Sequence, residues 1–413
     1  MVSINIKFIS LLLTVLLVSG CTRKFGTDSP AQRTYRDLTA AEISVVHSGE
    51  DFGLQLLKEL NSPDGNLFIS PLSVSMALGM TLNGADGETK SAMQKTLGFE
   101  SLSEEEINSS YQSLISLLQS MDEKVVFQIA NSIWSRLGFS VEPAFIDINQ
   151  KYFGAAVRGL DFSSAAAPGT INAWASENTA GKIDKIIDSI DPETMMFLIN
   201  AIYFNGDWTY EFDKEKTREA LFFVSESDQV SCDLMNQQNE FAYLSRSDVQ
   251  AIDLPYGNGQ FSMLVLLPQP EVSIDDVVQN LSPQSINEIL SDLAKAKGSL
   301  YLPKFKMRYD KSLNDVLASL GMAVAFSPLA ADFTRINKDG GLYISNVTHY
   351  SYIDVDEQGT EASAVTVVEV VGTSIGSPST GFVMRVDRPF LFLIRESHSN
   401  TVLFIGKIVN PNQ

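Results

Sequence analysis

The sequence contains very little cysteine and histidine. Only two of its 413 residues are cysteines and three are histidines. Two cysteines, Cys21 and Cys232, cannot build a disulfide framework in a chain of this length. Without a cysteine cluster to join the scattered histidines, the chain lacks the ligand set of a zinc site. We therefore predict no metal site and no cofactor.

Basic residues are also scarce, because 30 lysines and arginines face 50 acids and leave a net charge of −20. Binding to phosphates requires clustered basic residues, so nucleic acids and anionic membrane surfaces are not expected partners. Linkers rich in glycine, serine or proline, repeats and low-complexity tracts are absent after about residue 41. With 44% hydrophobic residues, residues 42–413 are predicted to form one large domain.

The first residues resemble an export signal. Residues 1–20 contain Lys7 and then an apolar run, Phe8 to Val18, which is too short for a comfortable membrane span. The run ends in Leu-Val-Ser-Gly-Cys21, which resembles the box at which bacterial lipoproteins are cleaved and lipidated on the cysteine. We expect residues 21–41 to be a polar tether. The domain would then be exported and lipid-anchored at Cys21 to a bacterial membrane, in the outer membrane or at the cell surface. An ordinary cleaved signal peptide is the alternative.

The periodicity of apolar residues predicts a mixture of helices and strands. Ser70-Pro71 supplies an N-cap followed by a proline at the first helical position. Helices dominate the first half and strands the second, which favours the α+β class. The expected helices include 41–60, a buried helix from Pro71, 107–118 and 310–320; the expected strands include 66–69, 125–135, 195–204, the hairpin 252–267, 300–307 and 343–356.

A late stretch, residues 356–374, is strand-like in composition but bounded by flexible residues. Side chains alternate between the two faces of a strand. Between residues 360 and 372 both acids, Glu361 and Glu369, fall on one face, so the other face can be buried without the cost of burying a carboxylate. Glycines and a proline interrupt the pattern at both ends, so the stretch could be an exposed loop or an inserted strand. The uncharged face carries Thr360, Ala362, Ala364, Thr366, Val368, Val370 and Gly372.

Three segments resemble the serpins, a family of protease inhibitors. Residues 357–364, Glu-Gln-Gly-Thr-Glu-Ala-Ser-Ala, resemble the hinge of the serpin reactive loop. Residues 387–393 resemble the signature beyond that loop, and residues 404–411 the C-terminal strand. The resemblance extends from about residue 42 to the end. It implies the α+β serpin fold, with three β-sheets, about nine helices and an exposed reactive-centre loop at about residues 357–381, in a monomer.

The resemblance also implies roles for particular residues. The "shutter" is a polar cluster beneath the centre of the large sheet, which could hold two strands closed and re-pair when they separate. The "breach" is the place where the loop enters the sheet, and there we predict a Glu357–Lys304 ion pair. The implied residues are Glu357, Gly359, Thr360, Glu361, Ala362, Ser363 and Ala364 in the hinge, Ser70, Ser73, Asn200 and His349 in the shutter, and Trp208, Lys304 and Glu357 in the breach.

By this resemblance, the chain is a suicide substrate that traps a protease while its cleaved loop inserts into the large sheet. Counting from Glu357 places the scissile bond at Thr373–Ser374, with Val368 and Val371 as secondary sites. The loop contains no lysine or arginine, so a protease whose pocket ends in a carboxylate would find no partner. We therefore expect elastase-like serine proteases as favoured targets, with cysteine proteases as a second class.

Two alternatives remain open. One is a serpin-fold carrier or chaperone that does not inhibit proteases. The other is a surface hydrolase, because Gly372-Thr-Ser374-Ile-Gly376 has the spacing G-x-S-x-G, and Asp387 and His398 follow it in the hydrolase order. A nucleophile elbow must open a helix, however, and residues 377–381, Ser-Pro-Ser-Thr-Gly, are not helical in character. This argues against the hydrolase.

Overall fold

A computed structural model describes residues 35–360 and 381–413. Residues 38–413 form one compact unit. The expected signal peptide (residues 1–20), Cys21 and most of the expected tether lie outside the described residues, as do residues 361–380. Within the described ranges, no helix combines the length and the apolar character needed to cross a bilayer.

The helices begin where the sequence supplies caps. The side chain of Ser70 accepts the amide of Ser73 at the start of the second helix, and Thr39 with Glu42 forms a capping box at the start of the first. The second helix is buried on nearly all sides, as its composition predicted. The described residues contain nine α-helices: α1 Ala40–Leu60, α2 Pro71–Leu82, α3 Gly87–Thr96, α4 Glu104–Ser120, α5 Pro143–Phe153, α6 Ala167–Asn178, α7 Ile274–Asn280, α8 Pro283–Asp292 and α9 Asn314–Leu317.

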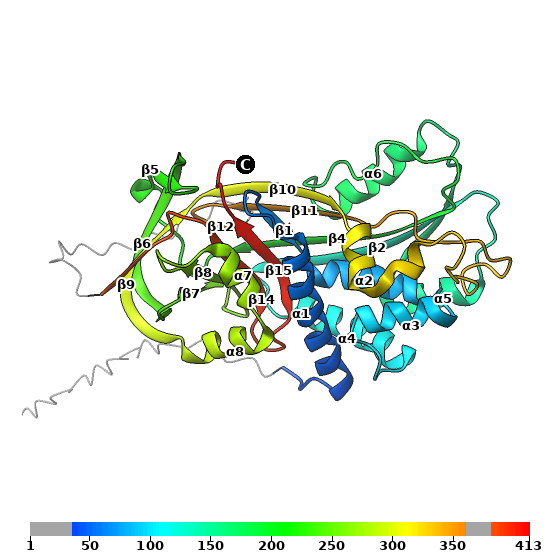
Figure 1. Ribbon diagram of the computed structural model, residues 1–413, viewed down its shortest axis with the longest axis horizontal. Helices are drawn as coiled ribbons and strands as arrows, with labels where there is room; N and C mark the ends of the chain where they lie inside the picture. The colour runs from blue at the N-terminus through cyan, green and yellow to red at the C-terminus, as the bar shows by residue number, and fades with distance from the viewer. Residues whose placement is uncertain (1–34, 361–380) are drawn as a thin grey trace, which may run out of the picture. The chain divides into compact units, whose positions relative to one another are not determined.

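Hydrogen bonds join the strands of the described residues into two sheets. The six-stranded sheet has the order β10-β11-β12-β4-β2-β3 and runs along the molecule in Figure 1. Its strands are β2 Val125–Arg136, β3 Ala156–Leu160, β4 Met196–Asp207, β10 Phe305–Ser312, β11 Thr348–Val355 and β12 Gly359–Thr360. The nine-stranded sheet contains β1 Leu67–Ile69, β5 Arg218–Phe223, β6 Gln229–Ser245, β7 Val249–Tyr256, β8 Phe261–Pro268, β9 Ala294–Pro303, β13 Phe382–Arg385, β14 Phe390–Glu396 and β15 Val402–Ile408.

The nine-stranded sheet contains two regions that meet in one strand. Strand β6 is 17 residues long. It pairs with β5 over its first part, with β7 over its last part, and with β9 along most of its length. Together with the six-stranded sheet, these two regions give the three-sheet α+β architecture that the serpin resemblance implied.

Three expected elements have different boundaries in the structure. The strand expected at 300–307 is two strands, because the chain leaves one sheet at Pro303 and enters the other at Phe305. The helix expected at 310–320 was wrong at its start, because residues up to Ser312 pair with β11 and only α9 is regular helix. The strand expected at 343–356 begins only at Thr348.

Helices cover both faces of the six-stranded sheet. Figure 1 shows α6 on one side of this sheet and α1 to α5 on the other. Helix α6 packs Ile171 and Trp174 against Trp134 of β2. Between the two sheets, Phe204 of β4 contacts Phe261 and Phe404 edge-on, with ring centroids 5.8 Å and 6.4 Å away. The aromatic layer therefore fixes the distance between the sheets around β4.

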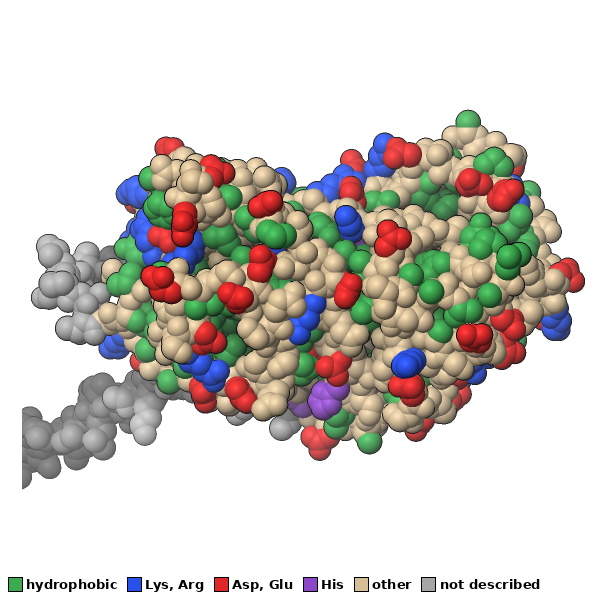
Figure 2. Space-filling view, viewed as in Figure 1, with side chains coloured by type: hydrophobic (Ala, Val, Ile, Leu, Met, Phe, Trp, Pro, Cys, Tyr) green, Lys and Arg blue, Asp and Glu red, His purple; other side chains and the backbone are tan. Residues whose placement is uncertain are grey.

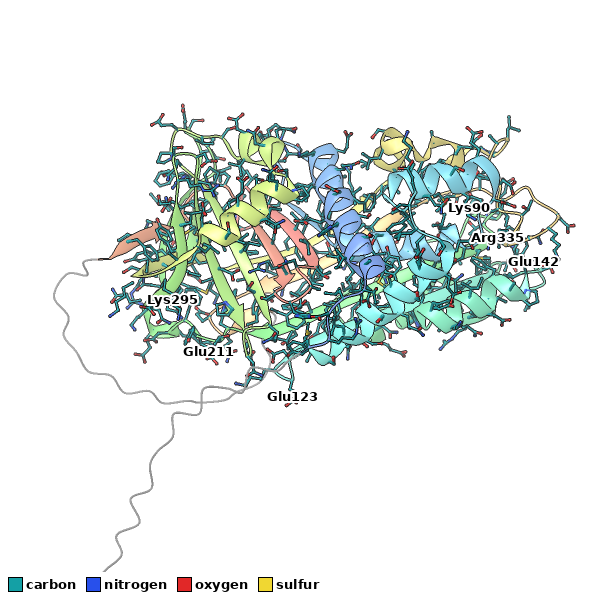
Figure 3. The ribbon with its side chains drawn as sticks, turned by 90° about the horizontal axis from the view of Figure 1, so that it is seen from below. Lys90, Glu123, Glu142, Glu211, Lys295 and Arg335 are labelled. Carbon is teal, nitrogen blue, oxygen red and sulfur yellow. The ribbon has the colours of Figure 1, made fainter. Side chains whose placement is uncertain are left out.

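An ion-pair cluster joins helices far from the loop. Arg335 donates two parallel hydrogen bonds to Glu104, at 2.7 Å and 2.8 Å, and Lys90 contacts the same carboxylate. Figure 3 shows Lys90 and Arg335 side by side at the end opposite the nine-stranded sheet. The hydrogen bond from Arg335 outweighs burial and, with Lys90, lowers the pKa of Glu104 to about 2. This end of the molecule is therefore fixed by a partly buried charge network.

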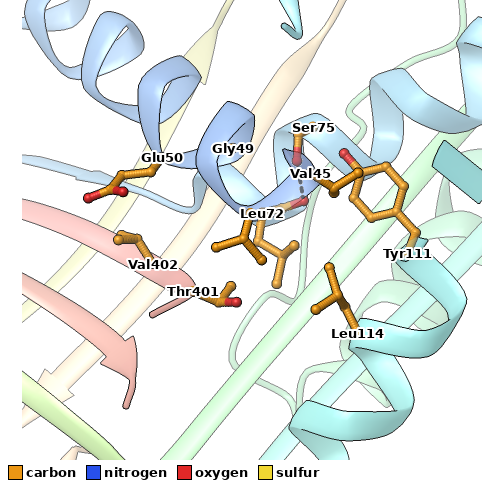
Figure 4. Close-up of a pocket in the computed structure, with 10 residues that line it drawn as sticks. Val45, Gly49, Glu50, Leu72, Ser75, Tyr111, Leu114, Thr401 and Val402 are labelled. Atoms are coloured by element: carbon orange, nitrogen blue, oxygen red, sulfur yellow. Dashed lines mark hydrogen bonds between the residues drawn. The ribbon is translucent and has the colours of Figure 1, made fainter. Parts of the chain in front are cut away.

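Helix α1 buries a carboxyl group that titrates near neutrality. Glu50 is 8% exposed and lines a small pocket with Leu72, Tyr111 and Val402 (Figure 4). Burial, with a smaller contribution from Asp51, raises the pKa of Glu50 to about 7. The folded protein therefore binds a proton that the unfolded chain releases near pH 4.5, and stability is lost as the pH rises from there through 7.

We expect Glu50→Gln to stabilise the protein at pH 8, by at most about 3 kcal/mol, and to change its stability little at pH 4. The measurement is the free energy of unfolding in guanidinium at the two pH values. Glu59→Gln, an exposed acid on the same helix, is the control. An equal gain at both pH values would contradict the assignment to the Glu50 proton.

Candidate functional site

The six-stranded sheet is interrupted by a very short strand. β12 contains only Gly359 and Thr360, yet it pairs with both of its neighbours: Thr360 lies opposite Val355 of β11 and Gly206 of β4. In the described part of the chain, β11 and β4 are joined only through β12 and do not pair directly with each other. The two strands therefore flank an interval that β12 occupies only at one end.

Gly359 has no space for a side chain. A Cβ at this position would lie 2.2 Å from the carbonyl oxygen of Gly206 and 2.7 Å from the Cα of Asp207. Both are backbone atoms of β4, which cannot move without disturbing the sheet. Glycine is required here by the close approach of two strands, which gives a physical reason for the hinge glycine that the sequence suggested.

The predicted ion pair is present just before β12. The ammonium of Lys304 lies 3.1 Å from Oε2 of Glu357, and the hydroxyl of Thr217 donates to Oε1 at 2.7 Å. Glu357 is 4% exposed. Burial acts to raise its pKa, but the hydrogen bonds from Thr217 and Lys304 outweigh burial and leave the pKa below its ordinary value. Glu357 is therefore a buried, charged carboxylate that fixes the turn before β12 to Lys304 and Thr217.

Trp208, the residue that follows β4, fixes the same turn. Its indole Nε1 donates to the carbonyl of Asp356 at 2.9 Å, and its backbone amide donates to the carbonyl of Gln358 at 2.7 Å. The indole stacks on Tyr256, with ring centroids 4.4 Å apart, and the Tyr256 hydroxyl lies 2.6 Å from Oγ1 of Thr360. Thr360 is thus held inward at 3% exposure. The structure brings together Trp208, Lys304, Glu357, Gly359 and Thr360.

Sequence reasoning missed Tyr256 and Thr217. Tyr256 ends β7, 104 residues before Thr360, and its aromatic ring would be explained equally well by an ordinary core. Thr217 lies between a short 3-10 turn and β5, with nothing in its neighbourhood to indicate a carboxylate partner. Only the three-dimensional structure reveals these two hydrogen-bond partners of Thr360 and Glu357.

The four predicted shutter residues also lie together. The backbone amide of Ser70 donates to Nε2 of His349 at 3.1 Å, and the hydroxyl of Ser73 donates to Oδ1 of Asn200 at 2.5 Å. These bonds join the start of α2 to β11 on one side and to β4 on the other. Asn131 of β2, which the sequence did not indicate, adds a further hydrogen bond to this cluster. Its Oδ1 accepts the side-chain amide of Asn200 at 2.8 Å. The polar cluster therefore lies beneath the interval between β4 and β11.

The His349 imidazole is neutral in the folded protein. It is 4% exposed, and burial lowers its pKa to about 4. Protonation would also remove the lone pair that accepts the Ser70 amide. Because the unfolded chain protonates His349 near pH 6.5, its contribution to stability is fully present above that pH and is lost as the pH falls through 4.

We expect His349→Gln to flatten the fall in stability between pH 6.5 and 4, by at most about 3 kcal/mol relative to the parent protein. Guanidinium unfolding of both proteins across this range is the measurement, with the exposed His47 replaced by Gln as the control. The same slope in the parent and in His349→Gln would show that this imidazole does not control acid stability.

Other predicted site residues lie outside the described residues: Glu361, Ala362, Ser363, Ala364, Val368, Val371, Thr373 and Ser374, together with Cys21. Of the hydrolase alternative, Asp387 and His398 can be placed. They flank opposite ends of the seven-residue strand β14, which separates them by roughly 20 Å at about 3.3 Å per residue. Asp387 is instead paired with Arg385 and Arg388. These two residues therefore do not form an acid–histidine pair.

The described residues contain no group of three or more histidine, cysteine, aspartate or glutamate side chains that could hold a metal ion. On the face shown in Figure 2, acidic side chains are interspersed with basic ones, without a continuous basic area. The site therefore consists of the facing edges of β4 and β11, buried hydrogen bonds and one ion pair. Such an arrangement could accept an additional strand between β4 and β11.

Comparison with known proteins gives a consistent result. The profile of one family, described as "Serpin (serine protease inhibitor)", matches residues 47–411. The leukocyte elastase inhibitor of Homo sapiens is 33% identical over 87% of this chain and 97% of its own length. Among solved structures, the native state of tengpin, a thermophilic serpin, covers 92% of this chain and 96% of its own with a TM-score of 0.81 at 33% identity. Human thyroxine-binding globulin in complex with its hormone has a TM-score of 0.82 at 28% identity, covering 91% of this chain and all of its own.

Proposed function

The chain belongs to the serpin family, and from that premise we propose that it inhibits serine proteases by trapping them as a suicide substrate. The observation that carries the proposal is β12, a two-residue strand already paired on both sides at the head of an interval between β4 and β11. A loop that is cut and freed could continue this strand. The bound protease would then be dragged along the sheet before it could complete hydrolysis.

The register of β12 determines which residues of β4 and β11 would lie opposite each residue of an inserted loop. Thr360 lies between Gly206 and Val355 in antiparallel pairing. Each two-residue step along the inserted loop then moves two residues along both neighbours. Thr366 would lie between Asn200 and His349, in the shutter. Because Thr360 faces inward, the even-numbered residues 362 to 370 would be buried, and all of them are uncharged.

The proposal includes a reaction with defined steps. The protease nucleophile attacks the carbonyl of Thr373, the bond to the nitrogen of Ser374 breaks, and an acyl-enzyme remains on the loop. Insertion of residues 361 onward would deform the protease before water could hydrolyse the ester. Elastase-like enzymes are favoured as targets, because no lysine or arginine lies between Glu357 and Met384.

We infer from the leader that the inhibitor works outside the cytoplasm, tethered through a lipid on Cys21 with residues 22–41 as a spacer. The apolar run before Leu-Val-Ser-Gly-Cys21 supports this inference. Metabolic labelling with a fatty acid, lost in Cys21→Ser, is the expected result. Label retained in Cys21→Ser would contradict the anchor and leave the inhibitor mechanism untouched.

The direct test of the function is to mix the protein with an elastase-type protease. We expect a complex that survives SDS and a released fragment of residues 374–413, identified by its mass. A protease whose nucleophilic serine is replaced by alanine should form no such complex. Thr373→Arg should transfer trapping to trypsin-like enzymes, whose pocket ends in a carboxylate. Cleavage without any complex, with every protease, would contradict the proposal.

A carrier function is the second candidate, favoured by the structural similarity to thyroxine-binding globulin. It predicts cleavage of the loop without a covalent complex and without stabilisation of the cleaved protein. The family relationship also answers the hydrolase alternative. Serpins are inhibitors or binding proteins, and the chain is not an enzyme.

A further inference from the structure

A segment that follows α6 crosses the interval between β4 and β11. Residues 183–190, here called the cover segment, are held from both sides. On one side, the Tyr350 hydroxyl of β11 donates to the carbonyl of Ile186 at 2.5 Å. On the other side, Asn172 belongs to α6, the helix that packs on β2 and β4, and its side-chain oxygen accepts the amides of Ile186 and Ile187, both at 2.9 Å. The cover segment therefore lies over the interval on the outward face of the sheet, which is turned away from the nine-stranded sheet.

The cover segment turns its apolar side chains toward the sheet. Ile186, Ile187 and Ile190 are half-buried and pack against an apolar cluster that joins α6 to the sheet. This cluster contains Trp174 of α6 and Ala201 of β4. The charged side chains of the segment are exposed instead. The surface that the segment presents to the interval is therefore apolar.

Strand β4 adds apolar side chains along the same interval. Residues 197–199 of β4 are half-buried, whereas their partners in β2, residues 132–134, are at most 1% exposed. β2 has a neighbour on each side, β3 and β4, but within the described residues this part of β4 pairs only with β2. Phe197 and Ile199, which pack against the same apolar cluster, therefore keep part of their surface exposed along the interval.

The register of β12 aligns two loop valines with this apolar surface. Antiparallel pairing continued from β12 would place Val365 between Ala201 and Tyr350, and two residues later would place Val367 beside Ile199. Odd-numbered loop residues would face outward, because the last residue of β12 faces inward. Of the odd-numbered positions from 361 to 369, these two alone are apolar. The apolar part of the outward face of the loop therefore coincides with the cover segment.

We propose that the cover segment, together with Ala201 and Ile199, is a docking surface for Val365 and Val367, which bind there once the cleaved loop inserts. The inference rests on the proposed inhibitory function and adds positioning residues to it. Even-numbered loop residues would be buried between the two sheets, and the two valines would bury part of the outward face as well. Apolar contacts on both faces would then hold the inserted strand, which favours insertion over release of the cleaved protein.

An aspartate at position 365 tests this docking through the ratio of cleaved, untrapped protein to covalent complex. We expect Val365→Asp to raise this ratio about tenfold or more with an elastase-type protease, because a carboxylate would be buried beneath the isoleucines. Ser379→Asp is the matched control, because it adds the same charge beyond the predicted scissile bond and should keep the parent ratio. A Val365→Asp protein that traps like the parent would overturn the docking surface.

A double-mutant cycle tests the contact itself, with guanidinium unfolding as the measurement. The effects of Val365→Ala and Ile186→Ala on the unfolding equilibrium constant should depart from additivity by about fivefold in the loop-cleaved protein, and should add in the intact protein. The matched control combines Val365→Ala with Ile43→Ala. This change removes the same atoms as Ile186→Ala from a position on α1 that is 43% exposed, and its effect should be additive in both forms.

The outcomes separate the docking surface from the proposed function. Trapping by the parent, with additive effects of Val365→Ala and Ile186→Ala in the cleaved form, would overturn the docking surface alone. A parent protein that is cleaved but never traps would overturn the proposed function and this inference with it.

Discussion

Replacing Thr360 by arginine is expected to convert the inhibitor into a substrate. Thr360 is 3% exposed and faces the Tyr256 hydroxyl in the layer between the two sheets. A guanidinium at this position must be buried without a partner, which costs several kcal/mol. Every 1.4 kcal/mol is a factor of ten, so the ratio of cleaved protein to covalent complex should rise roughly a hundredfold or more.

The measurement is a titration of elastase-type protease followed by SDS gel analysis. Ser379→Arg is the matched control, because it places the same side chain beyond the predicted scissile bond, in a part of the chain that the proposed mechanism does not insert. If Thr360→Arg still traps the protease one to one, burial of this face is not part of the mechanism.

Gly359→Ala is expected to have the second largest effect. Its Cβ would be forced to within 2.2 Å of the Gly206 carbonyl oxygen, so either β12 must leave the sheet or β4 must shift. Overpacking of this kind costs about 1–3 kcal/mol. Leaving the sheet would also break the contact of Thr360 with Tyr256. We expect a lower melting temperature of the intact protein and a loss of trapping.

A matched glycine makes this prediction specific. Gly169 lies in α6, and a Cβ added there would have no atom within 4 Å, so Gly169→Ala should be neutral or slightly stabilising. Differential scanning calorimetry of the two variants and the parent is sufficient. A Gly359→Ala protein that melts and traps like the parent would show that β12 does not sit as closely against β4 as the structure indicates.

The inward orientation of Thr360 could be predicted from alternation alone. The sequence placed Thr360 on the uncharged side, and the structure buries Thr360 against Tyr256. The hinge glycine and the Glu357–Lys304 contact were expected from the resemblance of short segments to serpins, and the structure contains both. The alternating pattern is predictive because side chains alternate between the two faces of a strand, so the sequence alone shows which face carries no charge.

Contacts between distant segments could not be predicted in this way. Tyr256, Thr217 and Asn131 each contribute a hydrogen bond to the site from a different strand or turn, and none has a neighbour in sequence that indicates its partner. The helix expected at 310–320 was wrong for a related reason. Asp310 resembles a helix cap in the sequence, but it lies opposite Tyr350 in a strand pair formed with residues 40 positions away. Tertiary pairing overrode local propensity there.

The most direct test of the account is to compare the thermal unfolding of the intact protein with that of the protein cleaved once at Thr373–Ser374. If the freed loop continues β12 between β4 and β11, the cleaved form must melt at a higher temperature, and the amides of β4 and β11 must exchange more slowly with deuterium. A cleaved form that melts no higher than the intact one, with unchanged exchange in these two strands, would contradict the insertion mechanism.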